Sequence, residues 1–452
     1  MSSSVDDLVQ NVQSLTVSAE AELRPDYLPF RPNDTTQNSI LKGLSDVPPF
    51  LFRVLTPHLA AELGNTNSWA LSLGASPDHR PDAPTHSQQD FLSLDCEEAA
   101  TSLYEQLTWK VPVPYRERWN LVSWTTSLLF ALRYMFYLAK NPKADERSAL
   151  ADIQLCIVRT DGLPPGVFVR DMYLIDHYAR HHRELRDPVQ NWREVDRREG
   201  GRLYFGEYLS QGALRIGGRS TVVSARDMVD RGLLRLMPEL SDDRDQKRKL
   251  RWANWVLDRR ACWLSTINGL LPPNPGPDEE KNIVRGIASL FPGFELPIAT
   301  HLLSLKPRQP KNQSLVRWLK SLGPVPNFYT KERPFYFIPP PPPQWQHLDR
   351  KMPELVQFEA LMLNLAILDR KEKKIQELRA RGIPLRCVDI RNSDIPDDTI
   401  QRNPFLYGKI PTRTIEEWNL YEIDEANRVL DRPEGMGVAK PCYDCGTPHG
   451  RL

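Results

Sequence analysis

The spacing of apolar and polar residues changes along the chain, and it indicates short strands mixed with helices. Apolar runs rich in β-branched and aromatic residues, typical of strands, occupy residues 48–55, 118–127, 153–159 and 166–175. Apolar residues at helical spacing occupy residues 96–107, and an almost wholly apolar segment follows at 128–139. Ser127 stands directly before that segment, where a hydroxyl can cap a helix. We therefore expect helices at both segments.

Residues 204–223 predict a β-hairpin with an acid at its open end. Strand-like runs at 204–216 and 219–223 flank Gly217 and Gly218. Glycine takes the positive φ of a tight hairpin turn at little cost, so two adjacent glycines between such runs favour a turn. Glu207 stands just ahead of the first extended run. This carboxylate is the first candidate for chemistry.

Beyond residue 240 the pattern becomes mainly helical. Helical spacing covers residues 241–269 and 278–291, and a long helix is expected at 353–381. The basic run at 247–251 stands beside acids of the same segment. Mixed charge of this kind is typical of a solvated helix face, so we expect no nucleic-acid partner.

These segments divide the chain into six parts and indicate an α+β fold followed by a mainly α-helical, proline-rich C-terminal region. The parts are a flexible N-terminal arm at 1–46, the α+β domain at 47–240, a helical region at 241–306, a proline-rich linker at 307–350, the long helix at 351–384 and an irregular tail at 385–452. Five consecutive prolines at 339–343 predict an extended segment. It would serve as a spacer or as a ligand for an aromatic groove on a protein partner.

Composition excludes several classes of protein. The sequence has 59 Lys and Arg against 58 Asp and Glu, so no overall field attracts nucleic acid or a membrane surface. The most apolar stretch, 128–139, is interrupted by Arg133 and is shorter than the ~20 residues of a membrane-spanning helix. Six cysteines in 452 residues do not make a disulfide framework, and the N-terminus has no apolar signal segment. We expect a soluble intracellular protein, cytoplasmic or nuclear, without membrane contact.

Two groups of residues have part of a metal-binding pattern. His177 and His181 stand four residues apart and could share one side of a helix, but no third ligand is evident. Cys442, Cys445 and His449 give half of a zinc-site spacing, without a convincing second pair nearby. We assign no metal centre, and these last three residues are retained as weak candidates.

Three chemically distinct features follow one another between residues 48 and 240. They are an arginine within a strand (Arg53), hydroxyls between a strand and a helix (Thr125, Thr126 and Ser127), and an acid that opens a late strand (Glu207). This order resembles that of the cholera-toxin-type ADP-ribosyltransferases, which carry an arginine, a Ser-Thr-Ser triplet and a glutamate. The local sequences also resemble uncharacterised fungal proteins with a domain of this class, through Phe-Arg-Val at 52–54, Trp-Thr-Thr-Ser-Leu-Leu-Phe-Ala at 124–131 and Glu-Tyr-Leu-Ser-Gln-Gly at 207–212. The resemblance covers somewhat under half of the chain.

The resemblance implies a split-sheet fold and a site for NAD as substrate. Cleavage of the bond between nicotinamide and ribose generates an oxocarbenium-like cation, and Glu207 would stabilise that charge. Arg53 would hold the phosphate or ribose side of NAD through charge-assisted hydrogen bonds. The other cofactor contacts would come from Trp124, stacked on the nicotinamide, and from the hydroxyls of Thr125, Thr126 and Ser127. These roles require the arginine, the hydroxyls and the glutamate to converge on one cleft.

Two positions depart from the family pattern and leave a second function open. Members that modify arginine carry an acid or glutamine two residues before the glutamate, where this chain has Phe205. The resemblance therefore implies an acceptor other than arginine. Thr125 also replaces the first serine of the triplet. The alternative to an NAD-dependent ADP-ribosyltransferase or NAD-cleaving enzyme is a catalytically inactive domain that serves as an intracellular protein-interaction module.

Overall fold

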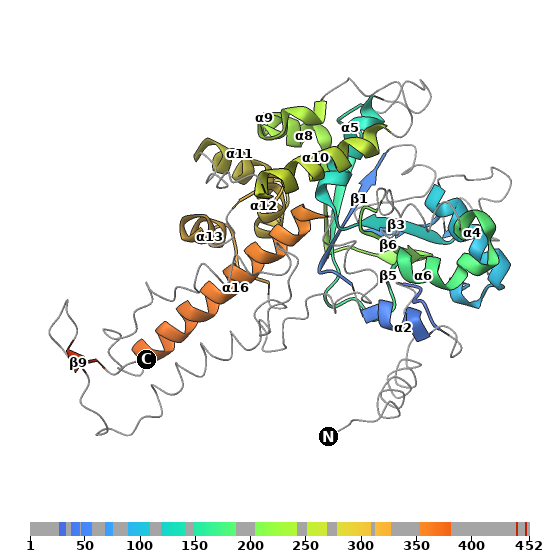
Figure 1. Cartoon of the computed structure of the whole chain (residues 1–452), viewed down its shortest axis with the longest axis horizontal. Helices are drawn as coiled ribbons and strands as arrows, with labels where there is room; N and C mark the ends of the chain where they lie inside the picture. Colours follow the sequence, from blue (N-terminus) through green and yellow to red (C-terminus); the bar gives the residue numbers. More distant parts are fainter. Residues whose placement is uncertain are drawn as a thin grey trace. The chain divides into compact units, whose positions relative to one another are not determined.

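The chain divides into a sheet unit and a helical unit (Figure 1). The sheet unit comprises Met1–Thr126, Asp152–Arg193 and Gly206–Val222, and the helical unit comprises Ser127–Ala151, Glu194–Phe205 and Val223–Leu452. The computed structural model describes residues 27–32, 38–45, 47–56, 68–75, 89–108, 119–140, 149–186, 204–241, 251–268, 278–308, 312–326, 352–380, 440–441 and 448–449. The sequence at 47–240, predicted as one domain, is therefore shared between the two units.

The sheet unit is built on a six-stranded sheet with the strand order β5-β6-β3-β1-β4-β8. Figure 1 labels four of these strands, β5, β6, β3 and β1. Its strands are β1 (Phe50–Leu55), β3 (Leu121–Thr125), β4 (Gln154–Arg159), β5 (Val169–Arg170), β6 (Glu207–Gln211) and β8 (Ser220–Ser224), whose last residues belong to the helical unit. β1 pairs antiparallel with β3 and β4, and β6 pairs antiparallel with β3 and β5. The apolar run Leu155–Val158 in β4 is buried throughout, so both faces of this strand are covered.

A second, two-stranded sheet shares a core with the first. β2 (Trp69–Leu71) and β7 (Ala213–Arg215) pair antiparallel. The common apolar cluster includes Leu51, Leu55, Val122, Trp124 and Val158 of the large sheet and Ala70 and Leu214 of the small one. Alternate residues of β1 and β3 therefore face this core, as the two-residue period of a strand requires.

The hairpin predicted for residues 204–223 is wrong, although its turn is present. β6 pairs with β3 and β5, β7 pairs with β2, and β8 lies beside β4 at the edge of the large sheet. At the turn, the Arg219 N–H donates to the Ile216 carbonyl at 2.9 Å, and Gly218 has a φ of 75°. The turn at the glycines thus connects β7 of the small sheet with β8 of the large sheet. A turn determines only the local direction of the chain, whereas the strands nearby determine which strands pair.

Helices α2 (Asn38–Ser45), α4 (Cys96–Thr108) and α6 (Asp171–Tyr178) complete the sheet unit, with α4 and α2 against α6 (Figure 1). α4 confirms the helix predicted at 96–107. The strand predicted at 166–175 is wrong for most of its length, because β5 ends at Arg170 and α6 begins at Asp171. The buried run 172–175 is apolar on every side. Such a short run has no period that separates a buried helix from a buried strand.

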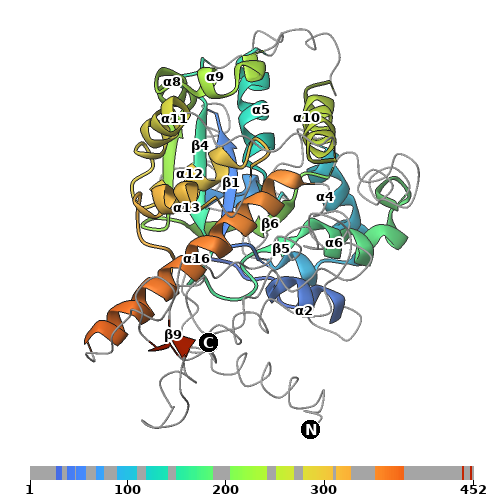
Figure 2. The ribbon, with the colours of Figure 1, turned by 60° about the vertical axis from the view of Figure 1, so that its left-hand side comes forward.

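The helical unit contains eight described α-helices and confirms the main helical predictions. They are α5 (Leu128–Ala139), α8 (Ala225–Asp230), α9 (Leu233–Leu236), α10 (Arg251–Asn268), α11 (Asp278–Ala288), α12 (Glu295–Leu303), α13 (Gln313–Lys320) and α16 (Pro353–Ala380). Figure 2 shows α16 as a long helix that passes α12 and α13, with which it packs. α13 corrects the prediction of a linker throughout 307–350, and the proline run at 339–343 lies outside the described residues. Among the helices that the structure describes, none has both the length and the apolar character needed to cross a membrane.

Candidate functional site

The three strands that carry the motif residues are neighbours in the sheet. Glu207 opens β6, Thr125 closes β3, and Arg53 lies within β1. The sheet order places β6 beside β3 and β3 beside β1. The glutamate, the hydroxyl and the arginine are therefore brought to adjacent strands from segments that are far apart in the sequence.

Thr125 and Glu207 are direct partners across the β3–β6 pair. Directly paired residues of antiparallel strands project to the same face, so the hydroxyl and the carboxylate share one face of the sheet. Glu207 is half-buried, and Thr125 is buried. The next pair of residues extends this contact, because the Thr126 N–H donates to the Gly206 carbonyl at 3.0 Å. Gly206 has a φ of 68°, which glycine adopts far more readily than other residues, at the point where the chain enters β6.

Arg53 lies on the opposite face of the sheet from this pair. Phe52 of β1 is the partner of Thr125, and side chains alternate along a strand, so Arg53 projects the other way. Arg53 is instead opposite Cys156 of β4, and its guanidinium carbon lies 5.7 Å from the centroid of the Trp124 ring. Burial raises the pKa of the Cys156 thiol to about 12, an effect that the nearby charge of Arg53 partly offsets. The expected convergence of the arginine with the hydroxyls and the glutamate is therefore not observed.

Trp124 is a core residue of the sheet unit. Its side chain is 2% exposed, and its indole N–H donates to the Ser210 hydroxyl at 2.9 Å. Its ring meets Phe168 edge to face, with 5.7 Å between the centroids. These contacts do not support the predicted stacking on nicotinamide, because a ligand needs an accessible ring face.

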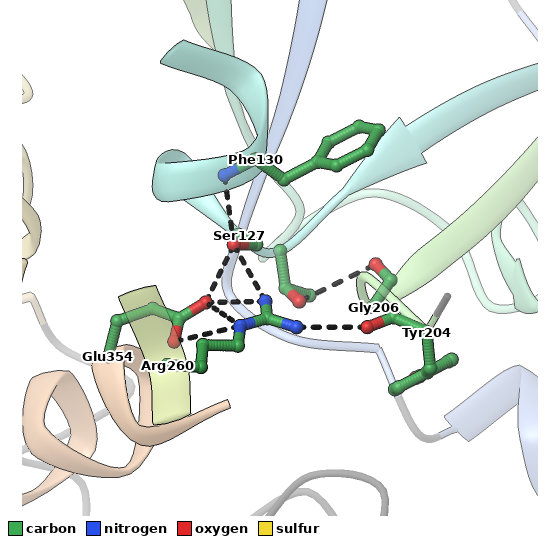
Figure 3. A network of polar contacts seen from close by, with 7 residues as sticks. Ser127, Phe130, Tyr204, Gly206, Arg260 and Glu354 are labelled. Atoms are coloured by element: carbon green, nitrogen blue, oxygen red, sulfur yellow. Dashed lines mark hydrogen bonds and ion pairs between the residues drawn. The ribbon is translucent and has the colours of Figure 1, made fainter. Parts of the chain in front are cut away.

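Ser127 belongs to the helical unit, where its hydroxyl has structural partners (Figure 3). It caps α5 as predicted, because its Oγ accepts from the Phe130 N–H at 3.2 Å. The same Oγ donates to Oε1 of Glu354 at 2.7 Å and accepts from Nη2 of Arg260 at 3.1 Å. A hydroxyl has one donor and two acceptor positions. These three bonds occupy all of them, which favours a structural role over the predicted contact with ribose.

Arg260 and Glu354 form a buried ion pair that the sequence analysis did not identify. Arg260 lies on α10 and Glu354 in the first turn of α16, and each side chain is 5% exposed. The pair is joined by Nε and Nη2 of the guanidinium, with Nη2 2.5 Å from Oε1, and Nη1 donates to the Tyr204 carbonyl at 3.0 Å. Arg260 lies in residues 241–269, for which the sequence predicted only a helix. No sequence spacing connects it to Glu354, which is 94 residues away.

Phe205, the residue that departs from the family pattern, is also part of the helical unit. Its ring stacks on Phe130 with 4.5 Å between the centroids, and the guanidinium carbon of Arg260 lies 5.6 Å from its centroid. Phe205 is buried. Phe205 thus serves the packing of the helical unit.

The metal candidates gain no support from the structure. His177 lies on α6 and His181 in the short 3-10 helix that follows it, Ala179–His181. Within the described ranges, no group of three or more His, Cys, Asp or Glu side chains could hold a metal ion. Cys442 and Cys445 lie outside the described residues, and His449 is placed only as part of the short strand β10 (Pro448–His449).

Comparison with known proteins identifies no relative. No protein-family model, no curated protein and no solved structure matches the chain.

Proposed function

We propose that the sheet unit is an ADP-ribosyltransferase-like domain that binds NAD and acts on its nicotinamide–ribose bond through Glu207. The observation that carries this proposal is the direct pairing of Thr125 with Glu207 at the end of two adjacent strands. Glu207 is half-buried rather than enclosed, so its carboxylate combines a fixed backbone position with access to solvent. The sequence resemblance of these two motifs supplies the reaction class.

In this proposal Glu207 stabilises charge as the substrate bond breaks. The bond between the ribose C1′ and the nicotinamide nitrogen breaks, nicotinamide leaves neutral with the electron pair, and the ribose becomes an oxocarbenium-like cation. A carboxylate fixed beside that cation lowers the barrier because it carries the opposite charge before the reaction begins. The Thr125 hydroxyl, on the same face, would orient the carboxylate or a ribose hydroxyl. Water or an acceptor other than arginine would then attack C1′.

Release of nicotinamide from labelled NAD tests this function. The full chain should release nicotinamide, and Glu207→Gln should lower the rate at least about 100-fold, the scale of losing one preorganised electrostatic group. Glu97→Gln is the matched control, because Glu97 is an exposed acid on α4 of the same unit. No release by the wild-type chain, or equal release by wild type and Glu207→Gln, would exclude the catalytic proposal.

The second function is a catalytically inactive domain that serves as a protein-interaction module. It is favoured by the position of Arg53, which shares the Trp124 face and not the Glu207 face. A domain that keeps this fold without a converging arginine would retain the strands and lose the reaction. Calorimetry with NAD separates the two functions. Absence of NAD binding favours the module, and NAD binding that is kept in Glu207→Gln while nicotinamide release is lost favours the enzyme.

A further inference from the structure

Arg260 holds together four segments of the helical unit (Figure 3). From α10 it binds Glu354 of α16, the Ser127 hydroxyl at the start of α5, and the backbone carbonyl of Tyr204. Ser127 and Glu354 are themselves hydrogen-bonded at 2.7 Å. The arrangement is buried and closed, since every partner of the guanidinium is a protein group of the same unit.

Two of these segments continue directly into the proposed site along the chain. Ser127 follows Thr125 by two residues, and Tyr204 precedes Glu207 by three. In the sheet unit the same two segments meet again, through the Thr126–Gly206 backbone bond and the Thr125–Glu207 pair. The segment that leaves β3 and the segment that enters β6 are thus each held by two sets of contacts. One set is the hydrogen bonds to Arg260, and the other is the backbone pairing of Thr126 with Gly206 and of Thr125 with Glu207.

We infer that Arg260, anchored by Glu354, is a positioning residue that fixes the backbone entering β6 and leaving β3, and with it the placement of Glu207 and Thr125. The importance of that placement for chemistry rests on the proposed function. The mechanical part of the inference does not, because it concerns the backbone alone.

The chemistry of the guanidinium explains why arginine suits this position. Its planar fork directs separate N–H groups at the Glu354 carboxylate, the Ser127 hydroxyl and the Tyr204 carbonyl. A lysine ammonium presents its donors from a single atom and cannot reproduce this pattern. A buried ion pair contributes little net stability over apolar residues but can specify one arrangement of the chain. Positioning is therefore a role suited to it.

The helical unit contains a matched control. Arg308 is buried, its Nη2 binds Glu280 at 2.7 Å, and its Nε donates to the Leu303 carbonyl at 2.7 Å. It thus combines one carboxylate and one backbone carbonyl, as Arg260 does. Glu280 lies on α11 and Leu303 on α12, so neither partner of Arg308 belongs to the segments that flank β3 and β6.

Hydrogen–deuterium exchange of the full chain, read by mass spectrometry, tests the positioning role without requiring activity. Arg260→Lys should raise exchange about tenfold or more in peptides that cover residues 121–131 and 204–211, because local opening becomes easier. Arg308→Lys should leave both peptides unchanged. Unchanged exchange in Arg260→Lys, or an equal rise in both variants, would overturn the inference. If Arg260→Lys does not fold, Glu354→Gln takes its place with the same two outcomes, because it weakens the anchor of Arg260 and leaves Ser127 as the cap of α5.

Kinetics then separate this inference from the proposed function. In an active enzyme, Arg260→Lys should lower kcat for nicotinamide release about tenfold and change KM little, since a displaced Glu207 stabilises the transition state less without altering ground-state binding. A raised KM at constant kcat would contradict positioning of the glutamate. If exchange changes as expected and the wild-type chain releases no nicotinamide, the proposed function fails and the role of Arg260 in fixing the two segments stands.

Discussion

Glu207 and Glu354 are two carboxylates that the chain treats in opposite ways. Glu354, in the helical unit, is 5% exposed and receives hydrogen bonds from Arg260 and Ser127. Glu207, in the sheet unit, is half-buried at the first residue of a strand, opposite a threonine. An enclosed carboxylate with charged and hydroxyl partners organises the chain around itself, whereas one that reaches solvent at a strand end can act on a substrate. The sequence resemblance singled out only Glu207.

The largest effect should follow from removing the cation beside Glu354. Arg260→Met keeps an apolar stem of similar length but leaves the buried carboxylate without its charge partner, which should lower the free energy of unfolding by about 3–5 kcal/mol. Urea unfolding measures it. The double variant with Glu354→Leu should recover most of the loss, because no unpaired charge remains. A single variant as stable as the wild type would show that the pair is not enclosed.

Exchanging each glutamate for glutamine should separate catalysis from stability. Glu207→Gln should lower nicotinamide release at least about 100-fold, since the charge that stabilises the cation is gone. Its urea midpoint should stay close to that of the wild type. Glu354→Gln should act mainly on stability, with a loss of roughly 1–3 kcal/mol because charged hydrogen bonds at a buried site are weakened, and it should lower release far less than Glu207→Gln does. If both variants lose stability equally, the comparison between the two carboxylates is wrong.

A buried histidine gives the helical unit a pH dependence of its own. His301 on α12 is stacked on Phe358 with 3.6 Å between the ring centroids, and burial lowers its pKa to about 3. In the unfolded chain its pKa is about 6.5, so between these values only the unfolded state binds the proton. Stability should therefore be complete above pH 6.5 and fall as the pH drops, by roughly 2 kcal/mol between pH 6.5 and 4.5. His301→Phe should remove this component from unfolding curves measured at several pH values, and an unchanged slope would contradict it.

The sequence predicted what local periodicity and capping determine. β1, β3, β4, α4 and α5 occur where apolar spacing indicated them, and Ser127 caps α5. Mixed helix and antiparallel sheet confirms the α+β class. The pairing of β6 with β3, by contrast, depends on segments far apart in sequence, so the turn glycines alone favoured the wrong partner.

The candidate site also depends on contacts between segments that are far apart in the sequence. The sequence predicted that an arginine, hydroxyls and a glutamate would meet, but the face on which Arg53 projects follows from the pairing of Phe52 with Thr125. A shift of one residue would have placed Arg53 opposite Thr125, on the same face of the sheet as Glu207 and two strands away from it. The partners of Ser127 lie 133 and 227 residues away, beyond the reach of any local pattern.

The smallest effect should come from Arg53, and it tests the assignment of faces most directly. Arg53→Met removes a charge that lies over the Trp124 ring on the face away from Glu207, so KM for NAD should change less than about threefold. Loss of the cation–π contact at a half-buried position should lower stability by about 0.5–1 kcal/mol. A rise in KM of about tenfold or more would mean that Arg53 holds NAD after all, as the family resemblance implied. An unchanged KM in Arg53→Met, together with loss of nicotinamide release in Glu207→Gln, would instead show that Glu207 acts on NAD and that Arg53 packs against the core at Trp124.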